Sequence, residues 1–190
     1  GSYLAAALTY LLLKQRDAAG LVTFDTGIRD YIAPRSIQGY LSRILTILQN
    51  LDSGGETDIA SNLHLMAERV KRRGLVILIS DLLDDPQAIL NGLKHFRHGG
   101  HEVLVFHMLD PAERDFGFRG NIRFRDMETG ERMPSAPEHL REDYRQAFRE
   151  YLNTLESGCR DNRIDYHLFD TSTPFDMALT QYLNKRARMR

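Results

Sequence analysis

Two short segments carry oxygen-bearing side chains at positions suited to holding a small cation. Thr57 follows the glycine-rich turn Gly54-Gly55-Glu56 and precedes an apolar-periodic stretch that predicts a helix. Asp81 follows the apolar run 75–80, which is typical of a strand buried on both faces. A loop hydroxyl and a strand-end carboxylate are hard ligands of the kind that Mg²⁺ or Mn²⁺ takes, usually with waters and a ligand from a partner completing the octahedron. The polar residues expected at the rim of this site are Asp25, Asp58 and Ser80.

Both candidate ligands also have ordinary structural uses. A threonine before a helix is a common cap, and an acid after a strand is common in turns, so the spacing alone leaves both interpretations of Thr57 and Asp81 open. Asp58 fits either a helix cap or a hydrogen-bond acceptor beside the metal. Asp85 and its neighbours fit the start of the next helix, and we assign them no chemistry.

The segment Phe24-Asp25-Thr26-Gly27 spells the catalytic signature of aspartic proteases. That chemistry needs two such aspartates sharing a proton, from two lobes or two subunits. Ile28 follows where the signature usually continues with serine or alanine, and the expected helices do not suit an all-β protease. The sequence therefore argues against a protease. It also contains no Gly-x-Ser-x-Gly elbow, P-loop or Gly-x-Gly-x-x-Gly motif.

Composition and charge narrow the class of protein. The 190 residues fit one α/β domain, and the net charge of −1 gives no general attraction for nucleic acid or an anionic membrane. The apolar stretch 4–13 stops at Lys14, too short for a bilayer that needs about 20 helical residues. Cys159 is the one cysteine, which suits a reducing cytoplasm, and its place in a helical pattern predicts a core residue.

Three histidines are close in sequence: His95, His98 and His101. The pattern places them on a helix end and the following loop. No carboxylate orients them, so we expect ordinary structural or surface histidines rather than metal ligands.

Hydrophobic periodicity predicts helices alternating with strands. The expected helices cover 3–16, 41–51, 59–70, a segment opening at Pro86, a long segment from Pro137 to Cys159 and a last one opening at 173–176. The expected strands cover 20–24, 28–32, 75–80, 103–106 and 164–169. The first helix is apolar nearly all round and should be deeply buried. Ser36 fits a cap of the second.

This alternation implies an α/β fold with a doubly wound, mostly parallel sheet. The strands 20–24 and 28–32 form a hairpin, and residues 110–136 predict a small hairpin insertion. The strand 164–169 alternates, so it lies nearer an edge. In such sheets ligands gather at the carboxyl ends of strands. The acids that end strands are Asp25, Asp81, Asp110 and Asp170.

The order of these motifs resembles the von Willebrand factor A domain. It runs from a helix through Gly-Leu-Val-Thr-Phe-Asp (20–25) and Gly-Gly-Glu-Thr-Asp-Ile (54–59) to Leu-Val-Ile-Leu-Ile-Ser-Asp-Leu (75–82). Within that superfamily, residues 79–84, 100–103 and 106–111 resemble one bacterial group, the domain of unknown function 58. That group is typically encoded beside MoxR-type AAA+ ATPases. The resemblance extends from about Tyr3 to Tyr182, so we expect one such domain over 1–190.

The resemblance implies a metal-ion-dependent adhesion site. Its usual parts are an Asp-x-Ser-x-Ser loop after the first strand, a threonine that Thr57 matches and an aspartate that Asp81 matches. The first loop has no counterpart, because Asp17 and Asp25 stand elsewhere and lack the serines. The first central strand, which belongs beside 20–24 and 75–80, is therefore expected to be absent, through truncation or degeneration. We favour truncation, since a natural protein would hardly leave two apolar strands flanking a gap.

The resemblance further implies a non-enzymatic interaction module. A divalent ion, Mg²⁺ or Mn²⁺, would be completed by a carboxylate from a protein partner, a MoxR-type ATPase or its client, in protein or complex maturation. The alternative is a metal-dependent hydrolase in the same crevice, with His107 the only nearby candidate base. Without the first loop, we expect this chain to bind metal weakly or not at all, and to self-associate through unpaired sheet edges.

Overall fold

The computed structural model describes residues 1–37, 39–51, 57–115, 122–125, 132–135, 137–172 and 180. The chain divides into two compact units, with the first covering residues 1–62 and the second residues 63–172. The boundary falls within α3 (Ile59–Arg69).

The first unit is built on an antiparallel hairpin. β1 (Ala19–Phe24) pairs with β2 (Ile28–Arg35), with Leu21 opposite Ile32 and Thr23 opposite Asp30. The Thr23 hydroxyl donates to Asp30 Oδ2 at 2.7 Å across the pair. This confirms the predicted hairpin around residues 25–27.

Two helices pack with this hairpin. α1 (Ser2–Lys14) contacts α2 (Tyr40–Gln49) and β1, and α2 contacts β2. Their shared core contains Ile32, Ile44 and Leu48. Both predicted helices are therefore confirmed, with bounds that differ by one to two residues.

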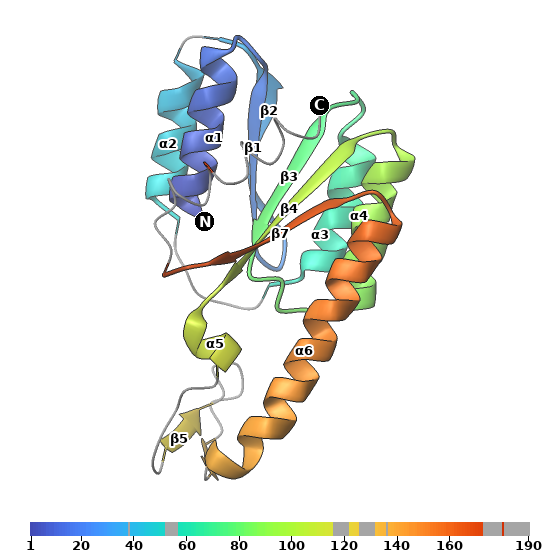
Figure 1. The fold of residues 1–190 in the computed structure, drawn as a ribbon. Helices are drawn as coiled ribbons and strands as arrows, with labels where there is room; N and C mark the ends of the chain where they lie inside the picture. The colour runs from blue at the N-terminus through green and yellow to red at the C-terminus, as the bar shows by residue number, and fades with distance from the viewer. Residues whose placement is uncertain are drawn as a thin grey trace. The chain divides into compact units, whose positions relative to one another are not determined.

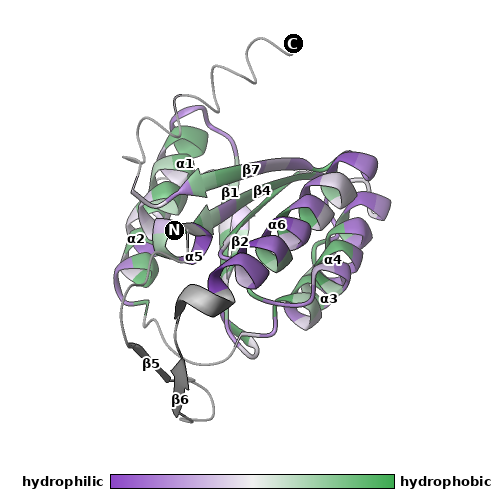
Figure 2. Ribbon diagram, turned by 60° about the horizontal axis from the view of Figure 1, so that its bottom comes forward, coloured by the Kyte–Doolittle hydropathy of each residue, from purple (hydrophilic) through white to green (hydrophobic). Residues whose placement is uncertain are grey.

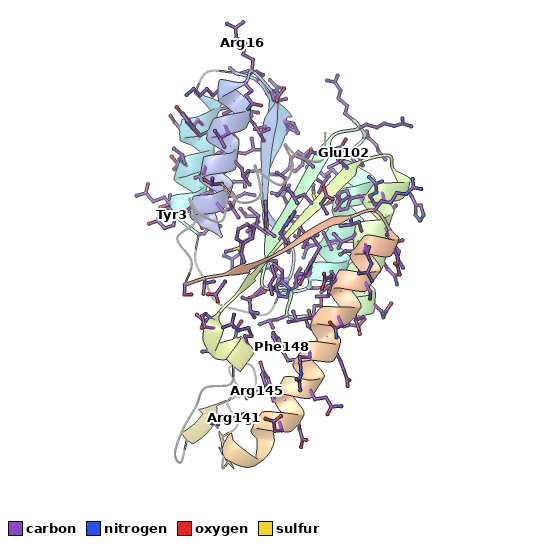
Figure 3. The ribbon with its side chains drawn as sticks, viewed as in Figure 1. Tyr3, Arg16, Glu102, Arg141, Arg145 and Phe148 are labelled. Atoms are coloured by element: carbon purple, nitrogen blue, oxygen red, sulfur yellow. The ribbon has the colours of Figure 1, made fainter. Side chains whose placement is uncertain are left out.

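The predicted deep burial of α1 is wrong. Leu4, Leu8 and Thr9 are buried, whereas Tyr3, which Figure 3 labels, is 79% exposed and Tyr10 is 49% exposed. The helix therefore buries one stripe, and an apolar composition all round did not translate into burial all round.

The predicted cap of α2 is also wrong. Gly39 is the N-cap residue, with a φ of 90° and no side-chain hydrogen bond, while the Ser36 hydroxyl donates to the carbonyl of Arg16 at 2.9 Å. Glycine reaches this left-handed conformation without a steric penalty. The entry to the helix is therefore made by the main chain.

The second unit is built on a parallel sheet. β3 (Leu75–Ser80), β4 (Glu102–Leu109) and β7 (Asp165–Asp170) pair in the order β3-β4-β7 (Figure 1). The register places Ser80 beside His107 and Val105 beside Tyr166. The predicted strands are confirmed, and so is the edge position of β7. The predicted burial of β3 on both faces is wrong, because Leu78 alone is buried and the rest of the strand is half-buried or exposed. All three strands end on the same side of this sheet.

Helices cover this sheet through apolar stripes (Figure 2). α4 (Pro86–His98) buries Ile89, Leu93 and Phe96, and α6 (Pro137–Asp161) packs against α4 and β7. The Asp85 carboxylate accepts a hydrogen bond from the N–H of Ala88 at 2.7 Å, which confirms the predicted helix start. Cys159 of α6 is buried as predicted, and burial raises the pKa of its thiol to about 12.

The hairpin predicted within residues 110–136 is confirmed, and its being an insertion stays a prediction. After the short helix α5 (Pro111–Asp115), β5 (Ile122–Arg125) pairs antiparallel with β6 (Arg132–Ser135). The turn 128–130, the glycine-rich turn 54–56 and the predicted helix start at 173–176 lie outside the described residues.

The described strands form three separate sheets. Among the described strands, the single partner of β1 is β2, and the single partner of β3 is β4, which also pairs with β7. The α/β class and the parallel strands are confirmed, whereas one doubly wound sheet lacking its first central strand stays a prediction. Within the described part of the chain, no helix is long and apolar enough to cross a membrane.

Self-association through the edge of β3 also stays a prediction. We expect Leu75→Lys, at a position 38% exposed at the start of this strand, to weaken any association, because lysine on an edge strand opposes pairing. Light scattering over a dilution series measures this, with Leu65→Lys on an exposed face of α3 as the control. A monomeric mass at every concentration would contradict the prediction.

The crossing of α4 and α6 allows a sharper stability test. A Cβ added at Gly158 would lie 2.3 Å from Leu90 Cδ1, so Leu90 must shift to admit it. We expect Gly158→Val to lower the free energy of unfolding by about 1–3 kcal/mol through overpacking. Urea unfolding measures the loss. Glu156→Val on the exposed side of α6 controls for the helix propensity of valine.

A double-mutant cycle identifies the cause of that loss. In a Leu90→Ala background the added side chain has room, so Gly158→Val should cost less than it does alone. Equal costs in the two backgrounds would refute the steric explanation.

Candidate functional site

The carboxyl end of β3 presents the candidate ligand Asp81 to solvent. The Ser80 hydroxyl donates to Asp81 Oδ1 at 3.3 Å, and the N–H of Leu83 approaches the same oxygen at 3.5 Å. These contacts orient the carboxylate and leave it accessible. The role of Ser80 at the rim of a metal site stays a prediction, since its contact with Asp81 is one between consecutive residues.

The next residue, Leu82, fixes the main chain of this turn. It has a φ of 56°, although it is not glycine, and its side chain is only 1% exposed. A left-handed non-glycine residue costs about 1–2 kcal/mol, so its surroundings must hold it in place. Its N–H donates to the Ser80 hydroxyl at 3.1 Å, and its carbonyl accepts from the N–H of Asp84 at 2.8 Å.

Tyr151 of α6 completes this restraint. Its hydroxyl donates to the carbonyl of Leu82, and its ring stacks on Phe148 one turn earlier, with centroids 6.2 Å apart. Figure 3 labels Phe148 on α6. Burial, together with the charges of Asp81 and Asp84, raises the pKa of Tyr151 to about 12. The phenol therefore stays protonated and remains a donor at physiological pH.

A buried histidine and a half-buried tyrosine form a polar pair on the neighbouring strands. His107 of β4 is 1% exposed, and its Nδ1 lies 2.6 Å from the hydroxyl of Tyr166 on β7. Burial lowers the pKa of His107, against the opposing effect of the main chain and charge of Asp81, and burial raises the pKa of Tyr166. Both groups are therefore neutral at pH 7, and we assign the Tyr166 O–H as donor to His107 Nδ1.

The remaining predicted residues lie in the first unit. Thr57 is exposed and directly precedes α3, whose cap is Asp58, because Asp58 Oδ1 accepts from the N–H of Ser61 at 2.9 Å. This hydrogen bond lowers the pKa of Asp58. The capping role considered for Thr57 therefore belongs to Asp58.

Asp25 lies beside the same helix start. Its carbonyl accepts from the N–H of Asp58 at 3.1 Å and from Asn62 Nδ2 at 2.8 Å. Its carboxylate accepts from the N–H of Gly27 and pairs with Arg29, and these contacts lower the pKa of Asp25. Asp25, Thr57 and Asp58 are thus neighbours within one unit. Thr57 and Asp81 belong to different units, so their joint use of one ion stays a prediction.

Sequence reasoning missed Asn62, Tyr151 and Tyr166. Asn62 is buried, and its position three residues after Ile59 on the apolar stripe of α3 was the available signal. Tyr151 also lies on an apolar stripe, where the pattern predicts that a tyrosine is a core residue. The partner of a buried hydroxyl depends on another element, so the pattern alone could not identify it.

The two other strand-end acids, Asp110 and Asp170, each contact a residue that follows the other's strand. Arg114 Nη1 lies 3.1 Å from Asp170 Oδ2, and the Thr171 hydroxyl donates to Asp110 Oδ2 at 3.3 Å. Hydrogen bonds from Ser172 and the nearby Arg114 lower the pKa of Asp170. No cluster of three or more histidine, cysteine or acidic side chains suited to a metal occurs in the described ranges.

Comparison with known proteins identifies a family and two structural relatives. The model of the family described as "Protein of unknown function DUF58" matches residues 2–153. The crystal structure of the conserved hypothetical protein BatB from Bacteroides thetaiotaomicron is similar, with 19% identity over 98% of this chain and 88% of that one and a TM-score of 0.58. An aerotolerance-related membrane protein from Bacteroides fragilis, carrying multiple mutations to serines, is 16% identical over 97% and 88%, with a TM-score of 0.59. Curated proteins gave no match.

The lowered pKa of His107 predicts a specific acid sensitivity. The unfolded chain takes up this proton near the ordinary value of 6.5, whereas the folded chain takes it up only at lower pH. The unfolded state therefore binds more protons between the two values, so stability is complete above about pH 6.5 and falls as the pH drops below it. We expect His107→Gln to flatten this fall in urea unfolding between pH 5 and 8. The exposed-site variant His98→Gln should keep the wild-type slope, and an unchanged slope for His107→Gln would contradict the assignment.

Proposed function

Because this chain belongs to the DUF58 family, we propose that it is a protein-interaction module of the von Willebrand factor A type rather than an enzyme. In this proposal Asp81 and Thr57 hold Mg²⁺ or Mn²⁺, and a carboxylate of a protein partner completes the coordination.

The observation that carries this proposal is the restrained exposure of Asp81. Hydrogen bonds hold Ser80 and Leu82 on either side of it, while its own carboxylate faces solvent. A fixed, accessible carboxylate at a strand end loses little conformational freedom on binding a cation. One carboxylate does not neutralise a divalent ion, which leaves charge to attract an acidic partner.

Thr57 suits the second ligand role. Since Asp58 caps α3, the exposed Thr57 is not required for that task. Its hydroxyl would supply one neutral oxygen, and Asp58 and Asp25 would support the loop through the hydrogen bond from the Asp58 N–H to the Asp25 carbonyl.

An exposed apolar side chain beside Asp81 favours a protein as the partner. Leu83 is 61% exposed and lies two residues from the candidate ligand. An apolar contact beside a charged contact is typical of a protein interface, whereas a small anionic ligand would gain nothing from it. We propose a MoxR-type ATPase or its client as this partner.

The environment of His107 favours binding over hydrolysis. A general base must reach the reacting water, and it works best with a pKa near the operating pH. His107 is buried, holds the Tyr166 hydroxyl at Nδ1 and has a lowered pKa. A screen of phosphatase and esterase substrates with Mg²⁺ or Mn²⁺ tests the alternative, and turnover that Asp81→Ala abolishes would refute the binding-only proposal.

We expect Asp81→Asn in the full-length protein to abolish Mg²⁺-dependent capture of a MoxR-type ATPase. The amide keeps the size of the side chain and removes the charge that holds the cation. Pull-down in Mg²⁺ and in EDTA measures capture, and circular dichroism checks the fold. Asp110→Asn, at the end of the neighbouring strand, is the matched control and should keep capture intact.

Two results would contradict this prediction. Capture that persists in EDTA would remove the ion from the interface, and capture that Asp81→Asn leaves unchanged would move the interface away from this strand end. The next surface to test would then be the insertion at 110–136.

A further inference from the structure

Two histidines that are far apart in the sequence meet in the second unit. His64 of α3 and His95 of α4 place their Nδ1 atoms 3.4 Å apart, and their ring centroids are 5.6 Å apart with the planes tilted by 49°. His64 is exposed and His95 is half-buried, so solvent reaches the pair. Neither residue takes part in the site proposed at Asp81.

The separation of the two nitrogens matches that of a shared tetrahedral ion. Zinc binds imidazole nitrogen at about 2.0–2.1 Å, so two ligands of one tetrahedral ion lie about 3.3–3.4 Å apart. Right-angled coordination at similar bond lengths would bring the nitrogens closer, to about 2.8–3.0 Å. The observed spacing therefore favours a tetrahedral ion over an octahedral or square-planar one.

We propose that His64 and His95 form a zinc-type metal site that links α3 to α4. Both Nδ1 atoms would be deprotonated and bind the ion, both Nε2 atoms would carry the proton, and solvent would fill the remaining positions. Zn²⁺, Cu²⁺ and Ni²⁺ bind well to imidazole ligands, whereas Mg²⁺ prefers oxygen ligands. This site is therefore chemically distinct from the one proposed at Asp81.

The simpler use of this geometry is a hydrogen bond between two neutral imidazoles. It would need one Nδ1 protonated and the other free, which a surface pair can adopt at little cost. A bound ion competes with this state for the same two Nδ1 atoms, and its binding moves the proton of the donor ring from Nδ1 to Nε2. The two uses differ in one measurable respect, because a hydrogen-bonded pair takes up no metal and a metal site does.

The site should be of moderate affinity. No third histidine, cysteine or acidic side chain joins the pair within the described residues. Structural zinc sites use four protein ligands and catalytic ones three, so a two-ligand site should bind in the micromolar range or weaker.

Titration calorimetry with Zn²⁺ on the full chain, in excess Mg²⁺, tests the proposal. We expect one zinc per chain in the wild type and loss of this binding in both His64→Gln and His95→Gln. His98→Gln is the matched control, because His98 is exposed on the same helix and lies outside the pair, so it should leave binding unchanged. Each variant changes an accessible side chain, and circular dichroism confirms the fold.

A thermal measurement gives an independent readout. An ion that bridges two helices of the folded state stabilises it, and at tenfold excess over its dissociation constant zinc should raise Tm by about 3–6 °C. The rise should vanish in His64→Gln and persist in His98→Gln.

Three results would overturn the proposal: no zinc uptake by the wild type, unchanged uptake by either variant of the pair, or loss of uptake in His98→Gln. Excess Mg²⁺ competes with Zn²⁺ for any oxygen site throughout. A negative zinc result therefore leaves the proposal at Asp81 unaffected. A failure of Mg²⁺-dependent capture through Asp81 likewise leaves the histidine site unaffected.

Discussion

The conformation of Leu82 decides where the end of β3 presents its carboxylate. A leucine in the left-handed region returns to ordinary backbone angles unless its surroundings prevent it. Here the preceding serine, the following aspartate and a tyrosine from α6 hold its N–H and carbonyl, while its side chain is buried. Local strain is thus stabilised by a distant helix, and the direction of Asp81 depends on how that helix packs.

The second unit keeps its polar groups neutral inside and its charged groups outside. The phenols of Tyr151 and Tyr166 are half-buried and the imidazole of His107 is buried, and the pKa of each is shifted in the direction that preserves the neutral form. Each makes a hydrogen bond that a neutral group can make, so burial costs little. Chemistry that requires charge is left to exposed side chains at strand and helix ends. This division suits a surface that binds ions and proteins.

The helices and strands of this chain could be predicted from the sequence, whereas several contacts between them could not. The strand 75–80 and the stripe of α6 follow from the apolar pattern of the sequence, but the burial of 75–80 on both faces does not, because burial depends on which neighbours cover the strand and only Leu78 is buried. The apolar composition of α1 led to a wrong prediction of deep burial, since composition does not report which face of a helix meets a neighbour. Asp81 was predictable as a strand-end acid. The restraint by Tyr151 and the meeting of His64 with His95 were not, because each joins residues whose proximity is created only by tertiary packing.

The common direction of β3, β4 and β7 has an electrostatic consequence. Because parallel strands all terminate on one side, the acids that follow or end them, Asp81, Asp110 and Asp170, collect there, and Arg114 offsets part of their charge. Their summed potential extends into solvent over about 8–10 Å at physiological ionic strength. Cations are therefore enriched in the solvent around this surface, and the enrichment falls as salt screens that potential.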